Sequence, residues 1–229
     1  MHQLSRNIAC FALLSLSSSI LQGATLFESA AIGTIGIKTE DLYSQAIKGL
    51  NIGHRLFSGV RFHVNSPAEV ENVGGHFVAF EPGNSLFAAI VSLDEETDFP
   101  NSFELLSSDV LGITLIDLPQ QSAEVFGELS LQLSPGWYAL VFGSELFGAT
   151  GGGGAVLNGQ DIGMPSYITA SENIPGIRWK EHSSNFRNMR FVVNGFQIPE
   201  PTSLSLVFVA IVSVFLFPRI RRETVTYST

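Results

Sequence analysis

Residues 125–143, VFGELSLQLSPGWYALVFG, decide the fold that the sequence predicts. In the first half of this stretch, Leu129, Leu131 and Leu133 alternate with polar residues. A period of two is typical of a strand with one buried face and one wet face. The turn signal Ser-Pro-Gly at residues 134–136 is followed by an apolar run of strand length, residues 137–142. The stretch therefore predicts two strands joined by a turn.

Similar short apolar runs occur along residues 24–197, and clusters of Gly, Pro, Asn and Asp separate them. The predicted strands are residues 60–64, 76–80, 86–93, 110–116, 125–133, 137–142 and 189–196, with turn signals at residues 73–75, 81–84, 99–101 and 134–136. Residues 40–50 form the only plausible helix. Seven or more strands at this spacing predict a mainly β domain, an antiparallel β-sandwich or jelly-roll-like fold.

The composition limits the classes of partner. With 45% hydrophobic residues among 229, one domain can build a sizeable core without disulfides. Residues 24–198 carry 8 Lys and Arg against 19 Asp and Glu, which gives a net charge near −11. This charge argues against nucleic acid and anionic membrane surfaces as partners. A divalent cation or a neutral sugar fits better.

The N-terminus has the order of a secretory signal. Residues 1–7 include Arg6, and residues 8–21 are apolar with interspersed serines. The small residues Gly23 and Ala24 then suit a signal-peptide cleavage site. We expect a signal peptide over residues 1–23 that contains a signal helix. The single cysteine, Cys10, lies within it, so the exported chain is expected to contain no cysteine and no disulfide.

The C-terminus combines three features in order: the motif Pro199, Glu200 and Pro201, an apolar run within residues 203–218, and a cluster of Arg219, Arg221 and Arg222. As a helix, residues 204–217 would span roughly 21 Å, against about 30 Å for a bilayer core. This predicts a short transmembrane helix that anchors the protein in the membrane only transiently. The arginines are expected to act as a membrane stop and to favour a cytoplasmic C-terminus. A buried C-terminal helix is the alternative.

Behind an N-terminal signal, this tail resembles the PEP-CTERM sorting-signal proteins of Gram-negative bacteria. The resemblance covers roughly residues 198–222, while Pro218 and residues 223–229 depart from the family pattern. It implies that an exosortase-type membrane protease processes the chain during delivery to the cell surface or to extracellular polymer. The predicted organisation is a signal peptide (residues 1–23), an ectodomain (24–197) and a sorting tail (198–229).

An acidic loop is a candidate calcium site. Asp94, Glu95, Glu96 and Asp98 lie within five residues, directly after a predicted strand. Hard oxygen ligands on a loop can hold calcium at the millimolar affinities of extracellular modules. The spacing does not match an EF-hand loop, and a solvated acidic loop is the alternative.

Aromatic residues are candidates for sugar binding, because a flat ring offers apolar area with a polar edge. Neighbours in a strand point to opposite faces, so one of Trp137 and Tyr138 is expected to enter the core. Trp179 lies between two basic residues and is expected to be exposed, and Tyr167 is a second candidate. The glycine-rich residues 148–154 predict a flexible loop that could flank such a surface.

Signals for catalysis are weak. The sequence contains no Gly-x-Ser-x-Gly motif and no HExxH or HxH spacing. A hydrolase would need two or three of a dispersed set to converge: Asp94, Glu95, Asp98, Glu104, His63 and His76. The favoured class is a noncatalytic exported protein of the cell surface or extracellular matrix, structural or adhesive, with extracellular polysaccharide as a candidate partner. A carbohydrate-binding module and a secreted hydrolase are the alternatives.

Overall fold

The computed structural model describes residues 24–42, 49–53, 55–157, 159–171, 179–181 and 187–198. Within them the chain forms one short helix, α2 (Thr39–Leu42), and the strands β1 (Ala24–Glu28), β2 (Gly49–Ile52), β3 (Leu56–Val64), β4 (Ala68–Ala79), β5 (Ser85–Leu93), β6 (Val110–Asp117), β7 (Ala123–Leu133), β8 (Gly136–Gly143), β9 (Gly153–Val156), β10 (Ser166–Ser171), β11 (Trp179–Glu181) and β12 (Phe191–Gln197). The prediction of a mainly β domain is confirmed.

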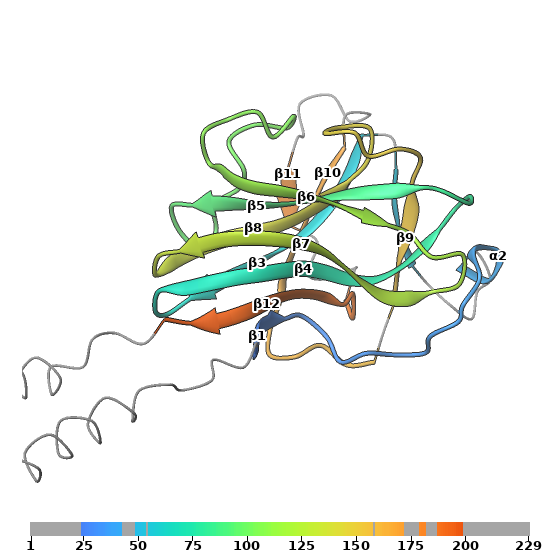
Figure 1. Ribbon diagram of the computed structural model, residues 1–229, viewed down its shortest axis with the longest axis horizontal. Coiled ribbons are helices and arrows are strands. Elements are labelled where there is room, and N and C mark those ends of the chain that lie inside the picture. Colours follow the sequence, from blue (N-terminus) through green and yellow to red (C-terminus); the bar gives the residue numbers. More distant parts are fainter. Residues whose placement is uncertain are drawn as a thin grey trace, which may run out of the picture.

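The strands form two sheets in which neighbours run antiparallel (Figure 1). The first sheet has the order β1-β12-β4-β9-β2, and β7 pairs with β4 as well. The long strand β4 organises this sheet, because its first part pairs with β12 and its last residues pair with β9. The second sheet has the order β11-β10-β3-β8-β5-β6.

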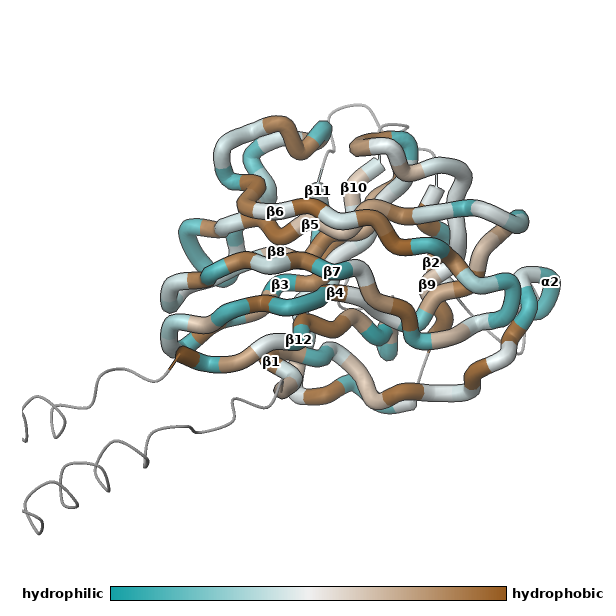
Figure 2. Tube along the Cα trace, viewed as in Figure 1, coloured by the Kyte–Doolittle hydropathy of each residue, from teal (hydrophilic) through white to brown (hydrophobic). Residues whose placement is uncertain are grey.

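The main hydrophobic core takes side chains from both sheets. Phe142 of β8 in the second sheet contacts Phe77 of β4 and Phe191 of β12 in the first, each with ring centroids 4.9 Å apart. Along β7, Leu129 and Leu133 enter this core while the polar residues between them are partly or fully exposed. Figure 2 shows hydrophobic and hydrophilic residues alternating along several strands, whereas α2 is hydrophilic.

A second hydrophobic cluster covers the other face of the second sheet. Phe57 of β3 stacks on Phe103 from the loop that follows β5, with ring centroids 5.0 Å apart. Nearly every residue of β5 and most of β8 are therefore buried. Burial on both faces explains why residues 86–93 and 137–142 are continuous apolar runs rather than alternating ones. As expected, one residue of the pair at 137–138, Tyr138, is buried.

All seven predicted strands are present, but two of the turn and helix predictions are wrong. Residues 73–75 lie inside β4. A Cβ at Gly74 would overlap the backbone oxygen of Val125 in β7, so this glycine serves close strand packing. The predicted helix over residues 40–50 is also wrong at its end, because Gly49 and Leu50 belong to β2, which pairs with β9.

The predicted targeting segments lie outside the described residues, including the signal helix, the motif Pro199, Glu200 and Pro201, the segment 203–218 and Arg219, Arg221 and Arg222. In the part of the chain that the structure does describe, no helix has the length and apolar character needed to span a membrane. Residues 153–154 of the predicted glycine-rich loop belong to β9 and are buried.

Candidate functional site

A pocket of about 800 Å³ lies beside the end of the second sheet at which β10 and β11 pair. We call it the Arg61 pocket. Its described lining comes from β3, the acidic loop, the segment before β10 and the first residue of β10, the end of β11 and the segment before β12: Arg61, Glu96, Thr97, Gln160, Asp161, Gly163, Met164, Pro165, Ser166, Glu181, Arg187 and Asn188. This volume is within the usual range for small-molecule sites.

Arg61 is the central side chain of this pocket, and only 2% of it is exposed. Its Nε donates to the backbone oxygen of Asp98 at 2.7 Å, and its NH2 donates to that of Thr97 at 3.0 Å. Its NH1 donates to Ser166 Oγ at 2.8 Å. Burial lowers the pKa of Arg61, while the charges of Glu181, Asp98 and Glu96 act against this shift.

Arg61 thereby fixes the acidic loop that was predicted to bind calcium. Within the loop, the Asp98 carboxylate accepts hydrogen bonds from the backbone N–H of Asp94 at 3.0 Å and of Phe99 at 2.8 Å. Glu95 accepts one from the Thr97 hydroxyl at 2.7 Å. Among the residues described, no three His, Cys, Asp or Glu side chains are grouped so that they could hold a metal ion. Calcium binding stays a prediction.

Tyr167 occupies a different place from the one its sugar-binding role would require. The residue is fully buried, and its hydroxyl lies 2.7 Å from Asp161 Oδ1 and 2.9 Å from the backbone oxygen of Met189. Burial and the neighbouring Asp161 carboxylate raise the pKa of Tyr167. Its ring has no exposed face for a sugar in this structure. Instead, its hydroxyl positions Asp161 in the pocket wall.

Trp179, the other predicted sugar-binding residue, is half-buried in β11. Its ring packs against Phe57, with centroids 6.3 Å apart, as part of the second hydrophobic cluster. Neither Trp179 nor Tyr167 is among the described residues that line the Arg61 pocket. One of the predicted calcium residues, Glu96, does line it.

The residues proposed for a hydrolase are dispersed. His63 is exposed on β3 and contacts Asn65 at 3.0 Å, whereas His76 is buried in β4. Glu104 is exposed in the loop between β5 and β6. None of these three is among the described residues of the Arg61 pocket.

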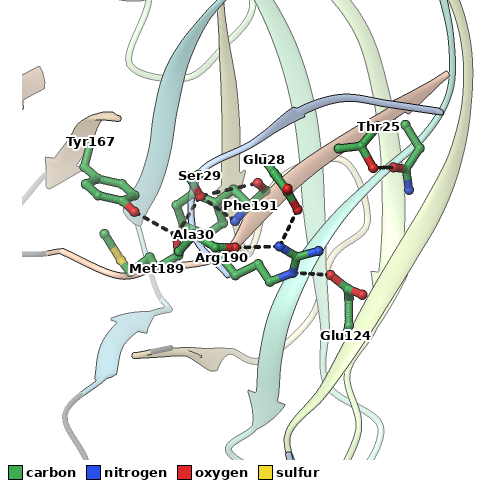
Figure 3. A network of polar contacts seen from close by, with 10 residues as sticks. Thr25, Glu28, Ser29, Ala30, Glu124, Tyr167, Met189, Arg190 and Phe191 are labelled. Carbon is green, nitrogen blue, oxygen red and sulfur yellow. Dashed lines mark hydrogen bonds and ion pairs between the residues drawn. The ribbon is translucent and has the colours of Figure 1, made fainter. Parts of the chain in front are cut away.

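A second polar network surrounds Arg190, just before β12 (Figure 3). Its NH1 contacts Glu28 at the end of β1 at 2.7 Å and the backbone oxygen of Ala30 at 2.5 Å, and its Nε contacts Glu124 of β7. Burial acts to lower the pKa of Arg190, but its bonds to Glu28 and Glu124 outweigh burial and raise it. We call this group the Arg190 clamp.

Ser29 extends the clamp into the core. Its hydroxyl donates to the backbone oxygen of Met189 at 2.6 Å and accepts from the N–H of Phe191 at 2.8 Å (Figure 3). The end of β1 is therefore fixed to the start of β12 by side chains as well as by the strand ladder. This network uses its polar groups internally, which is typical of a structural role.

Of the two polar networks, the Arg61 pocket is the better candidate for ligand binding, because it borders a cavity. Two guanidinium groups, three carboxylates and two side-chain amides line it, so its described lining holds both donors and acceptors. Sequence reasoning missed Arg61, although a lone charge between Val60 and Phe62 in a predicted strand was a usable signal. No protein-family model matches the chain, and no curated protein is similar to it in sequence.

Proposed function

We propose that this chain is a noncatalytic protein of the cell surface or extracellular matrix of a Gram-negative bacterium, with a structural or adhesive role. A PEP-CTERM-like sorting tail delivers it, and an exosortase-type protease is its processing partner. The observation that carries the proposal is the pairing of the first and last described strands, β1 (Ala24–Glu28) and β12 (Phe191–Gln197).

The two ends of the domain are also neighbours in space. β1 and β12 pair antiparallel, with Ala24 opposite Gly195, so the chain enters and leaves the domain at the same edge of the first sheet (Figure 1). Described ends that lie on paired strands suit a domain that is held at a membrane by one end during transit. The Arg190 clamp links β1 to β7 through ion pairs with Glu28 and Glu124. These contacts stabilise the edge of the sheet and support a domain that stays folded after cleavage.

The finer architecture belongs to the same proposal. Antiparallel sheets that share one core support a two-layer sandwich of jelly-roll type. A domain of this type can be exported without disulfides, because its aromatic core stabilises it in place of them.

Mass and location of the product test the proposal. The full chain is expressed in a Gram-negative host with and without an exosortase, and intact mass is measured in the cytoplasm, membranes and medium. We expect a product that starts at residue 24 or 25 and ends near residues 199–201, outside the cell, only when the protease is present. The variant Glu200→Ala is expected to accumulate in the membrane, whereas Glu223→Ala, beyond the arginines, is expected to be processed normally. A full-length product in the cytoplasm of both hosts would contradict the proposal.

A carbohydrate-binding module is the second candidate function. The observation in its favour is the polar Arg61 pocket, and not the exposed aromatic surface that the sequence suggests.

A further inference from the structure

We propose that the Arg61 pocket binds a neutral, hydroxyl-rich ligand, namely a unit of a polysaccharide chain. This inference deepens the adhesive part of the proposed function and rests on it for the extracellular setting. It concerns a site that the expected sugar-binding aromatics, Trp179 and Tyr167, do not line.

The first argument is the hydrogen-bonding state of Arg61. A guanidinium has five N–H donors. Three of those of Arg61 are used, by the backbone oxygens of Asp98 and Thr97 and by the Ser166 hydroxyl. The other two have no hydrogen-bond acceptor among the described residues. Because 98% of the side chain is buried, these donors lack the hydration of an exposed guanidinium, and Arg61 lines the pocket into which an acceptor could enter.

The second argument is that carboxylates line the same pocket. Glu181, an ion-pair partner of Arg61, is 3.9 Å from its NH1, which is too long for a hydrogen bond. The Oδ1 atom of Asp161 accepts from the Tyr167 hydroxyl and from the N–H of Asn188, each at 2.7 Å. Its other oxygen, Oδ2, makes no hydrogen bond within the described part of the chain. The lining of the pocket thus combines guanidinium N–H donors with a carboxylate oxygen that accepts no hydrogen bond from the described residues.

The third argument selects the class of ligand. A hydroxyl group both donates and accepts, so neighbouring hydroxyls can bond a guanidinium and a carboxylate at once. An anionic ligand would meet three carboxylates in the pocket and a domain of net charge near −11. A cationic ligand would meet Arg61 and Arg187. A neutral ligand rich in hydroxyls is the one that matches both kinds of group.

The rim of the pocket adds an apolar contact. Met164 is 99% exposed and is followed by Pro165, and both belong to the lining. An unbranched methionine adapts its shape to a bound surface. It can cover the C–H face of a sugar ring whose hydroxyls point toward Arg61.

Affinity electrophoresis of the full chain, purified in a mild detergent, tests the inference. The gels contain dextran, galactomannan or xylan as neutral polymers and alginate as an anionic one. Arg61→Gln could fail to fold, because that side chain is buried, so the main variant is Glu181→Gln, whose side chain is 56% exposed. The matched control is Glu128→Gln, an equally conservative change at an exposed position of β7.

We expect at least one neutral polymer to retard the wild-type chain and the control equally, and Glu181→Gln to bind about tenfold more weakly, as the loss of a charged hydrogen-bond partner predicts. No retardation by any neutral polymer, equal retardation of Glu181→Gln and Glu128→Gln, or stronger retardation by alginate would overturn the inference. Purified protein is used, so the result is independent of export. Absent binding with normal processing rejects this inference alone, and binding by a chain that stays in the cytoplasm rejects the proposed delivery alone.

Discussion

Removal of the Arg190 clamp should destabilise the domain substantially. Arg190→Ala leaves the carboxylates of Glu28 and Glu124 without their cation and the backbone oxygen of Ala30 without its donor. Loss of one partner of a fully buried ion pair costs about 3–5 kcal/mol, while a fully exposed pair contributes about 0–1 kcal/mol. The Arg190 side chain is 12% exposed, but those of Glu28 and Glu124 are 36% and 25% exposed. We therefore expect a loss of about 2–3 kcal/mol.

Urea unfolding of the full chain measures this loss directly. In a domain of this size, the same change corresponds to a fall in Tm of roughly 4–12 °C. Lys38→Ala is the matched control, because it removes a cation from an ion pair with Glu40 in which both side chains are more than half exposed. We expect a change within about 0.5 kcal/mol for this control. An equally small change for Arg190→Ala would refute the reasoning that the clamp stabilises the edge formed by β1 and β12.

Three further changes test other contacts. Gly74→Ala should destabilise the domain by about 1–3 kcal/mol in urea unfolding, because the new methyl group would overlap the backbone oxygen of Val125; an unchanged midpoint would contradict the strand register. Tyr167→Phe should cost about 1–2 kcal/mol by the same assay, since Asp161 loses a donor, and wild-type stability would show that this hydroxyl is dispensable. Calcium at about 5 mM should raise the Tm above that in chelator through the predicted site at residues 94–98, where Asp98 and Glu95 already accept bonds within the loop; an equal Tm in both would count against that site.

The sequence predicts strands well where one-sided burial produces an alternation of apolar and polar residues. It mispredicts turns where a glycine lies inside a strand and permits close packing. Alternation along residues 125–133 predicts β7 because one face of that strand meets the core. Glycine signals a turn in sequence, yet Gly153 lies in β9, where a Cβ would come 2.6 Å from the backbone oxygen of Val78. A glycine that permits close approach of two strands looks the same in sequence as one that permits a turn.

The site is harder to predict than the fold because its parts come from distant segments. Arg61 and Ser166 are 105 residues apart in the chain and bond only because β3 pairs with β10. Asp161 is held in the pocket wall by a hydrogen bond from the Tyr167 hydroxyl. No rule of sequence spacing indicates this tertiary contact. The sequence predicts that Tyr167 binds sugar through its ring. In the structure the ring is buried, and the hydroxyl bonds Asp161.

The two buried arginines of this domain differ in their bonding partners, and this difference distinguishes a stabilising role from a role in recognition. Arg190 has two carboxylates in direct contact, and its pKa is raised. Arg61 is more deeply buried, yet its bonding partners are backbone oxygens and a hydroxyl, its nearest carboxylate partner lies at 3.9 Å, and its pKa is lowered. A buried charge that is incompletely paired is costly to the fold. Arg190 shows that this domain can place carboxylates in direct contact with a buried guanidinium, so the lack of such a contact at Arg61 supports the ligand-binding role proposed for it.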